Sequence, residues 1–410
     1  MVKAITEDLK RKVAQLFIIR ASGHLFDNQR EYPVWEISNR EIKQLLEQGV
    51  GGVIFFGGSI YELHSRCRIC KKWAKDPLLL CADVEEGIGQ RFNGASKFIP
   101  PMGLAHIYQQ DKSRAIELAE LYGQFTADQA KMSGLNWILA PVCDVNTNSA
   151  NPVINVRAWG EDPKTVSSLV CAFQRGIIAS KVLSCAKHFP GHGDTGVDSH
   201  FDLPIVEHDI NRLEEVELIP FRNLIAEGIN SIMIGHLMMN KIDRFYPATL
   251  SSKVITKLLR DRLKFDGLIV TDALVMNSIS KKYGPEEASL LAFEAGADLI
   301  LMPKNPLASI DAICEAFLSG RFPLDRLEES LYRRKRALDL VKIDCTSNFD
   351  DDLLLKAKEI DNEQEKIFSI ELIERSIKTN GLSIKDINDG INLLRIDDFS
   401  LLSGRIDSLP

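Results

Sequence analysis

Residues 182–200 read VLSCAKHFPGHGDTGVDSH, an apolar run followed at once by a dense polar cluster. From Lys187 onward, the cluster holds three histidines, two aspartates and one lysine among three glycines and a proline. The apolar run predicts a buried strand, so these polar side chains would lie where that strand ends. Loops that a rigid scaffold positions often carry functional residues, and we therefore predict a catalytic loop here.

Three interpretations of this loop differ in the chemistry that they require. In the first, the histidines only satisfy buried backbone groups. In the second, the loop holds a metal ion through the side chains of His192, Asp194, Asp198 and His200. Zinc sites, however, usually repeat Cys or His at closer spacing. We favour the third, in which Asp198 orients His200 so that its imidazole transfers protons near neutral pH.

The pattern of a short apolar run that ends in a polar residue recurs along the chain. We predict strands over residues 14–19, 50–56, 78–83, 137–144, 183–188, 231–236, 267–272 and 298–302. Helices are predicted over residues 39–48, 61–74, 112–133, 163–181, 211–228, 252–263, 286–296 and 323–341. The alternation of strand and helix indicates a parallel sheet that is covered by helices.

Eight strand and helix units can form either a closed barrel or an open sheet. An open sheet that binds a dinucleotide carries a GxGxxG loop after its first strand, which residues 18–23, IIRASG, do not contain. We therefore expect an α/β fold in which residues 1–345 form a (β/α)8 TIM-type barrel. Such a barrel places its catalytic groups at the carboxyl ends of its strands. The polar residues that end predicted strands are Asp83, Asp144, Lys187, His188, His236 and Asp272. Asp144 and His236 fit a structural hydrogen-bonding role equally well.

Composition and charge argue against several classes of protein. The chain has 45% hydrophobic residues, and no apolar stretch approaches the ~18–20 residues that span a bilayer, so we expect a soluble protein without a membrane partner. Its first residues, MVKAITED, lack the basic start and apolar core of a secretory signal, which favours a cytoplasmic location. The formal net charge is −7, with no basic stripe that would indicate a nucleic-acid partner. Eight scattered cysteines, of which only Cys67 and Cys70 form a CxxC pair, suit reduced and buried thiols.

The string KHFPGHGDT at residues 187–195, followed by DSH at 198–200, resembles the signature of one branch of glycoside hydrolase family 3, the β-N-acetylglucosaminidases (β-N-acetylhexosaminidases). The resemblance extends from about residue 10 to residue 343. It implies a TIM-barrel glycosidase that releases terminal β-linked N-acetylglucosamine from a small carbohydrate substrate and needs no metal or cofactor. By the same resemblance, the β-glucosidases of the wider family lack the DSH segment and take their acid from a later domain.

The resemblance also implies the catalytic residues of a retaining mechanism. Asp272, in GLIVTDALVM at residues 267–276, stands where the family has the nucleophile that forms a covalent glycosyl-enzyme intermediate. His200 is implied to be the acid/base, and Asp198 its orienting partner. Judged by its local sequence alone, Asp272 fits the cap of a following helix equally well.

Two further stretches resemble the sugar-binding motifs of the family. DVEEGIGQR at residues 83–91 resembles Asp-Gln-Glu-Gly-Gly-Arg-Val-Gln-Arg, and NPVINVRAWGEDP at residues 151–163 resembles Asn-Pro-x-Ile-Gly-x-Arg-Ser-Phe-Gly-x-Asp-Pro. The residues implied to bind the sugar are Asp83, Arg91, Arg157, Lys187 and His188. The first motif is altered at Val84, Glu86, Ile88 and Gly89. We therefore expect the loop after Asp83 to differ in shape or to admit a different neighbouring group.

The resemblance suggests substrates and leaves several alternatives open. The expected substrates are cell-wall muropeptide fragments, as in peptidoglycan recycling, or chitin-type oligosaccharides. A β-glucosidase or β-xylosidase of the same family is one alternative. A β-N-acetylglucosaminide phosphorylase is another, because an acid/base that is not a carboxylate repels an incoming anion less. A barrel metallohydrolase and a non-catalytic sugar-binding protein are alternatives from other classes.

Residues 346–410 differ from the rest of the chain in charge, with 14 acidic and 8 basic residues. We expect an acidic linker followed by a segment that resembles the start of the second α/β domain of longer family members. A stretch of roughly 40 residues is short for an independent core. This segment is therefore expected either to pack on the barrel or to be a truncated remnant.

Overall fold

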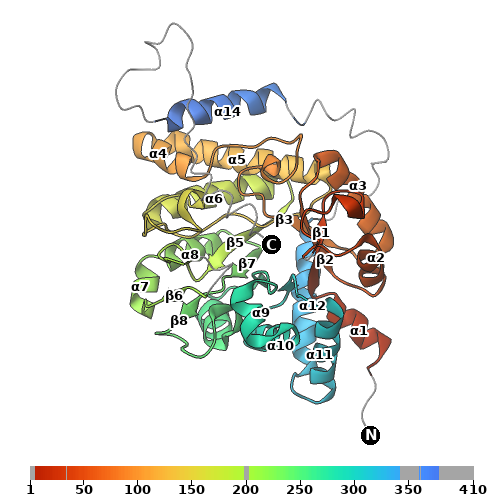
Figure 1. The fold of residues 1–410 in the computed structure, drawn as a ribbon. Coiled ribbons are helices and arrows are strands. Elements are labelled where there is room, and N and C mark those ends of the chain that lie inside the picture. The colour runs from red at the N-terminus through yellow and green to blue at the C-terminus, as the bar shows by residue number, and fades with distance from the viewer. Residues whose placement is uncertain (1–4, 34, 198–202, 342–359, 361, 378–410) are drawn as a thin grey trace.

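Eight parallel strands form a barrel that the helices surround (Figure 1). The computed structural model describes residues 5–33, 35–197, 203–341, 360 and 362–377. The strands of the barrel are β1 (Phe17–Ser22), β2 (Gly52–Phe56), β3 (Leu79–Ala82), β4 (Trp137–Ile138), β5 (Leu183–Phe189), β7 (Ser231–Ile234), β9 (Leu268–Thr271) and β10 (Ile300–Leu301). They pair in the order β10-β1-β2-β3-β4-β5-β7-β9, and a bridge between Val270 and Leu299 joins β9 to the residue before β10. The predicted (β/α)8 TIM-type barrel is confirmed.

All eight predicted strands are present, although their ends differ from the prediction. Glu7–Ala14 form helix α1, so β1 begins at Phe17 rather than at Ala14. Strand β4 covers only two residues of the predicted 137–144, and Pro141, which has no N–H to donate, interrupts the ladder. The chain nevertheless continues beside β5, where the N–H of Lys187 donates to the carbonyl oxygen of Pro141 at 3.1 Å.

Helices connect the strands and cover the outside of the barrel. They are α1, α2 (Asn39–Glu47), α3 (Ile60–Trp73), α4 (Met102–Gln110), α5 (Lys112–Ser133), α6 (Pro163–Ala179), α7 (Ile210–Glu215), α8 (Leu218–Ala226), α9 (Asn277–Tyr283), α10 (Pro285–Ala295), α11 (Pro306–Leu318), α12 (Leu324–Leu340) and α14 (Glu363–Ser376). A π-helix, η5 (Lys253–Arg262), stands where the sequence predicts an α-helix. The helix predicted over 211–228 is divided into α7 and α8, because the backbone leaves the helical region at Val216 (φ −129°, ψ −74°). The sequence does not predict α4, α9 or α11.

Two apolar layers stabilise the barrel. Inward-pointing side chains such as Ile18, Leu79 and Val270 fill its interior, while their neighbours along the strands pack against the helices. Inside the barrel, the indole N–H of Trp137 donates to Ser231 Oγ at 2.9 Å, so this buried polar group is satisfied. The seven cysteines that the structure describes are buried and form no disulfides, as the sequence predicts. Because the interior is filled, a functional site is expected at the ends of the strands rather than in a central pore.

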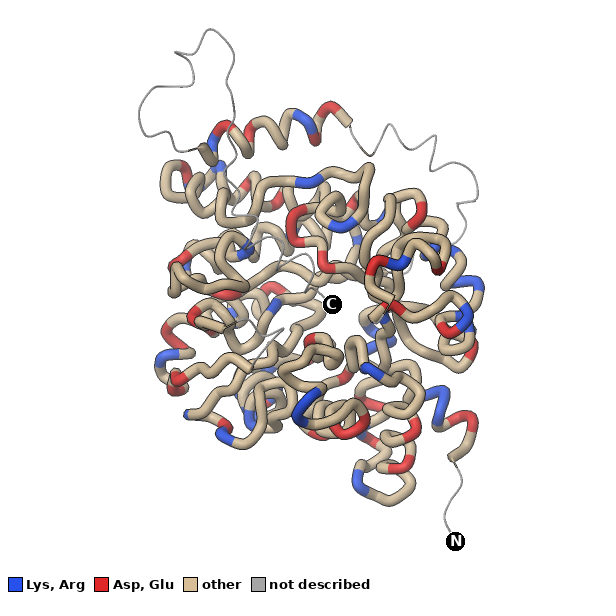
Figure 2. Tube along the Cα trace, viewed as in Figure 1, with Lys and Arg blue, Asp and Glu red and all other residues tan. Residues whose placement is uncertain are grey.

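Charges are mixed over the described surface. Figure 2 shows basic and acidic positions interspersed along the outer helices in this view, without a face of one sign. This distribution agrees with a sequence that has no basic stripe. Among the described helices, none combines the length and the apolar composition that a bilayer crossing requires.

Helix α14 packs against α4 and α5, at the top of the molecule in Figure 1. Phe368 lies in an aromatic cluster with Phe98 and Phe125, each at a ring-centroid distance of 5.1 Å. Glu371 accepts two hydrogen bonds from Arg114, at 2.8 and 2.6 Å. Part of the C-terminal segment therefore packs on the outer layer of the barrel.

Replacing Phe368 by Ala should detach α14 from the barrel. Loss of a buried aromatic ring costs roughly 3–5 kcal/mol, which is more than surface ion pairs supply. Limited proteolysis should then cut within residues 363–376 faster than in the wild type. Ile370→Ala, which shortens an exposed side chain of the same helix, is the matched control and should leave the rate unchanged. Equal cleavage of F368A and wild type would mean that other contacts hold the helix.

Candidate active site

Lys187, at the carboxyl end of β5, is the centre of a buried group of charges. The residue is 1% exposed, and its Nζ lies 2.6 Å from Asp83 Oδ1 and 2.6 Å from Glu85 Oε1. Burial lowers the pKa of Lys187, but the two carboxylates outweigh this effect and raise the pKa above its ordinary value. The lysine is therefore a charged donor that links β5 to the loop after β3.

Glu85 connects Lys187 to Arg157. Its buried carboxylate accepts two hydrogen bonds from Arg157, through Nε and Nη2, both at 2.8 Å. Burial alone would raise the pKa of Glu85, but Arg157 and Lys187 hold it well below its ordinary value. This bidentate pair fixes the plane of the guanidinium, whose Nη1 donates to the carbonyl oxygen of Val153 at 3.2 Å. Glu85 is a site residue that the sequence alone does not single out, although it occupies the glutamate position of the motif that begins at Asp83.

Asp144 follows β4 and orients two histidines of the polar loop. Its buried carboxylate lies 2.8 Å from His188 Nδ1 and accepts a hydrogen bond from the backbone N–H of His192 at 2.7 Å. Burial would raise the pKa of Asp144, but His188 and His192 lower it below its ordinary value. His192 Nδ1 lies 2.6 Å from Thr195 Oγ1, and burial lowers the pKa of His192 to about 4. Asp144 is thus a positioning residue, and His192 is a neutral side chain at pH 7.

Asp272 follows β9 at the same end of the barrel. Its side chain is partly exposed, and Oδ1 accepts a hydrogen bond from the N–H of Ala273 at 2.8 Å. The next helix begins only at Asn277, so Asp272 does not cap a helix. Buried His236, which follows β7, positions the adjacent peptide, because its Nε2 lies 3.0 Å from Ala273 O and its Nδ1 lies 2.7 Å from Thr249 Oγ1. The backbone that carries the Asp272 carboxylate is therefore firmly held.

Gln90 holds the loop after β3 in a tight bend. Its Oε1 accepts hydrogen bonds from the N–H groups of residues 85 and 86, at 2.6 and 3.0 Å. Ile88, one of the positions that depart from the motif, is fully buried under the loop. Arg91 Nε donates to the carbonyl oxygen of Asp83 at 3.1 Å. The altered residues are thus accommodated, and Asp83 and Arg91 stay close together.

The structure gathers most, but not all, of the residues that the sequence singles out. Two of them, Asp198 and His200, lie outside the described residues. Asp194 lies 2.9 Å from His208 instead of joining the charged group. Over the part of the chain that the structure describes, no group of three or more His, Cys, Asp or Glu side chains is arranged to hold a metal ion. Fixed donors and acceptors around Lys187 are suited to a ligand with many hydroxyl groups.

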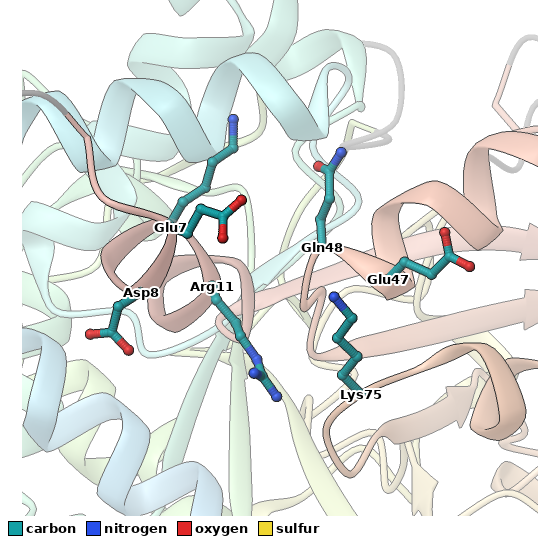
Figure 3. A pocket seen from close by; sticks show the side chains of 7 residues that line it. Glu7, Asp8, Arg11, Glu47, Gln48 and Lys75 are labelled. Atoms are coloured by element: carbon teal, nitrogen blue, oxygen red, sulfur yellow. The ribbon is translucent and has the colours of Figure 1, made fainter.

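A polar hollow also lies at the opposite end of the barrel (Figure 3). Its volume is about 470 Å³, and its lining includes Glu47 and Gln48 at the end of α2 and Lys75 after α3. Both helices end just before β2 and β3 begin, so the hollow lies at the amino ends of the strands. Barrel enzymes carry their chemistry at the carboxyl ends, and the group around Lys187 is therefore the candidate active site.

Known proteins resemble this chain in sequence and in structure. Residues 8–337 match the family model described as the glycosyl hydrolase family 3 N terminal domain. Beta-hexosaminidase A of Pseudoalteromonas piscicida is 36% identical over 287 residues, which are 64% of this chain and 47% of that protein. Beta-hexosaminidase of Nitrosospira multiformis is 32% identical over 278 residues, which are 67% of this chain and 79% of that protein. The chain thus spans about half of the first relative and about four fifths of the second.

Solved structures resemble the fold over most of the chain. One of them is the glycoside hydrolase family 3 beta-N-acetylglucosaminidase from Paenibacillus sp. str. FPU-7, with a TM-score of 0.78 and 32% sequence identity. The match covers 92% of this chain and 71% of that one.

The low pKa of His192 predicts a specific loss of stability in mild acid. The unfolded chain protonates this histidine below about pH 6.5, whereas the folded protein does so only near pH 4. The contribution of neutral His192 to the free energy of unfolding is therefore fully present above pH 6.5 and is lost as the pH falls toward 4. Over this window, the free energy of unfolding should fall by up to about 3 kcal/mol more in the wild type than in His192→Asn, which has no titrating ring. Urea unfolding across the window measures the difference, and identical pH slopes would contradict the prediction.

Proposed function

Because the chain belongs to glycosyl hydrolase family 3, we propose that it is a retaining β-N-acetylhexosaminidase that releases terminal β-linked N-acetylglucosamine. The names of the relatives, two beta-hexosaminidases and a beta-N-acetylglucosaminidase, support this class of substrate. One observation carries the proposal. Asp272 is a partly exposed carboxylate on a fixed backbone, at the same strand ends as the charged network of Lys187 and Glu85.

The proposed reaction has two steps. Asp272 attacks the anomeric carbon as the bond to the leaving oxygen breaks, and His200, oriented by Asp198, donates a proton to that oxygen. A water molecule then attacks the anomeric carbon of the glycosyl ester, His200 takes the proton of the water, and the Asp272 carboxylate leaves. Two inversions give net retention of configuration. The roles of Asp198 and His200 rest on the DSH sequence alone, and no metal or cofactor takes part in either step.

We propose that the charged network holds the sugar ring. Asp83 would accept hydrogen bonds from sugar hydroxyls, and Lys187 and Arg157 would donate to their oxygens. His188 and Arg91 complete the proposed binding set. Salt bridges fix Lys187 and Arg157 before the sugar arrives, so binding needs little ordering of side chains. Preorganised donors of this kind also favour correct placement of the anomeric carbon at Asp272.

For natural substrates, we propose cell-wall muropeptide fragments first and chitin-type oligosaccharides second. A panel of aryl glycosides of N-acetylglucosamine, glucose, xylose and galactose separates a hexosaminidase from a β-glucosidase or β-xylosidase. Product analysis with and without inorganic phosphate separates hydrolysis from phosphorolysis, since only phosphorolysis yields a sugar 1-phosphate. Turnover of the glucoside or xyloside in preference to the N-acetylglucosaminide would contradict the proposed specificity.

Replacing Asp272 by Ala should lower kcat for an aryl β-N-acetylglucosaminide by at least roughly a thousandfold, because the variant lacks the nucleophile and forms no ester. Added azide should restore part of the rate and give an α-glycosyl azide, since a single displacement inverts the anomeric carbon. Asp266→Asn is the matched control. Asp266 precedes the same strand at its other end and pairs with Arg336, so this change should leave kcat near the wild-type value. A near-wild-type rate in D272A would remove Asp272 as the nucleophile.

Replacing His200 by Ala should affect substrates according to their leaving group. A poor leaving group needs the proton, so turnover of an N-acetylglucosamine disaccharide should fall by about 100- to 10,000-fold. A dinitrophenyl glycoside has a leaving group that needs no proton. For this substrate, the rate of the first step should therefore fall much less. His208→Ala is the control, because His208 is a different histidine, which pairs with Asp194 of the loop. Any loss of rate in H208A should be independent of the leaving group. Equal losses for both substrates in H200A would exclude an acid role.

A further inference from the structure

Arg20 is a buried cation on the strand that begins the barrel. It lies on β1, in register with Ile54 of β2, and its side chain is 2% exposed. Among the described residues, none provides a hydrogen-bond partner for any of its three guanidinium nitrogens. A guanidinium carries five N–H donors, and buried donors of a charged group are expensive to leave unsatisfied. Such an arrangement suggests that a partner binds from outside the chain.

Nearby carboxylates do not supply the missing partner. Glu36 Oε1 is 4.0 Å from Arg20 Nη2, beyond hydrogen-bond distance. The other oxygen of Glu36 accepts a hydrogen bond from the N–H of Tyr32 at 3.1 Å. Burial raises the pKa of Glu36, which weakens it further as a counter-ion. The side chain of Glu31 is more than half exposed, and its Oε1 lies 3.6 Å from His24 Nε2.

Arg20 packs against the rings of Tyr32 and Phe56, and it also lines a hollow. The hollow has a volume of about 270 Å³ and lies between β1, β2 and the loop after β3. Its lining includes Arg20, Tyr32, Phe56, Gln90, Arg91 and the more exposed Glu31. A volume of this size admits a small polar group but not a whole oligosaccharide.

A second cation faces the same aromatic ring. The guanidinium carbon of Arg20 is 4.1 Å from the ring centroid of Phe56, and that of Arg91 is 5.5 Å from it. A ring face attracts cations but does not replace hydrogen-bond acceptors for their in-plane N–H groups. Burial lowers the pKa of Arg20 to about 10, with Arg91 adding to this effect and the charge of Glu36 opposing it, so the side chain stays charged at neutral pH. An anion between the two guanidinium groups would relieve their repulsion.

We propose that this hollow is a subsite for an oxyanion, a carboxylate or phosphate group, which Arg20 binds through its unused N–H donors. The planar guanidinium matches two oxygens of either group. Arg91 donates to the carbonyl oxygen of Asp83, so the hollow adjoins the proposed sugar site. The assignment of the oxyanion to a substituent of the bound saccharide rests on the proposed function. A free oxyanion would use the same donors, and the experiment separates the two sources.

The first measurement needs no turnover. The thermal unfolding midpoint should rise in sodium phosphate or sodium acetate relative to sodium chloride at equal ionic strength, and it should rise more in the wild type than in Arg20→Met, in which only the general stabilising effect of these salts remains. Arg66→Met is the matched control, because Arg66 is as buried but donates through Nε to Ser22 O at 3.2 Å. R66M should lose stability in every buffer and keep the response to oxyanions. R20M should be at least as stable as the wild type in chloride, since it removes an unpaired buried charge.

The second measurement tests whether the oxyanion belongs to the substrate. Two N-acetylglucosaminides that differ only in a carboxylate or a carboxamide serve as competitive inhibitors of an aryl β-N-acetylglucosaminide. The wild type should bind the carboxylate about tenfold to a hundredfold more tightly, and R20M should lose this preference. If the rise of the unfolding midpoint depends on Arg20 but the wild type does not prefer the carboxylate inhibitor, the site binds a free oxyanion.

Two results would overturn the subsite. One is an oxyanion response that R20M retains in full, and the other is a loss of stability in R20M like that of R66M without any change in oxyanion binding. These results are distinguishable from failure of the proposed function. A chain that turns over no N-acetylglucosaminide but shows an Arg20-dependent response to phosphate would keep the subsite and lose the hydrolase proposal.

Discussion

A buried lysine ammonium is costly unless carboxylates pair with it, and this constraint on Lys187 organises the candidate active site. Its two partners, Asp83 and Glu85, both lie in the loop after β3, while Lys187 itself lies on β5. Glu85 extends the pairing to Arg157, which ends a 3-10 helix (Asn155–Arg157) in the loop between β4 and α6. The two cations and two anions balance one another, so removal of any one of them would leave the network with a net charge. The network therefore fixes three separate segments at one end of the barrel.

The surrounding structure supports this network from several sides. Gln90 closes the loop after β3, Asp144 orients His188, and His236 holds the peptide after Asp272. Helix α14 reaches the same loop from outside, where Glu365 accepts a hydrogen bond from Ser96 Oγ at 2.6 Å. The C-terminal segment thus contacts this loop, although Glu365 is 269 residues away from Ser96 in the sequence.

The eight strands could be predicted from the sequence, because an apolar run indicates a buried strand. The strand-end positions of Asp83, Lys187 and Asp272 could also be predicted, because the first polar residue after such a run indicates where the strand ends. The residues that pair with these buried charges could not be predicted in the same way. Glu85 was missed because pairing with Lys187 depends on how two loops approach one another. The break between α7 and α8 was missed because an apolar face continues across it. Arg20 lies within an apolar run, so its sequence position indicates a strand but gives no sign of unsatisfied donors.

The measurement that tests the account most directly is a crystal structure of the protein with bound N-acetylglucosamine. The account predicts the sugar at the carboxyl ends of the strands, with its hydroxyls hydrogen-bonded to Asp83, Lys187 and Arg157. The anomeric carbon should lie within roughly 3.5 Å of a carboxylate oxygen of Asp272. A sugar bound at the opposite end of the barrel, in the hollow of Figure 3, would contradict it, as would one bound near Lys187 with Asp272 out of reach of the anomeric carbon.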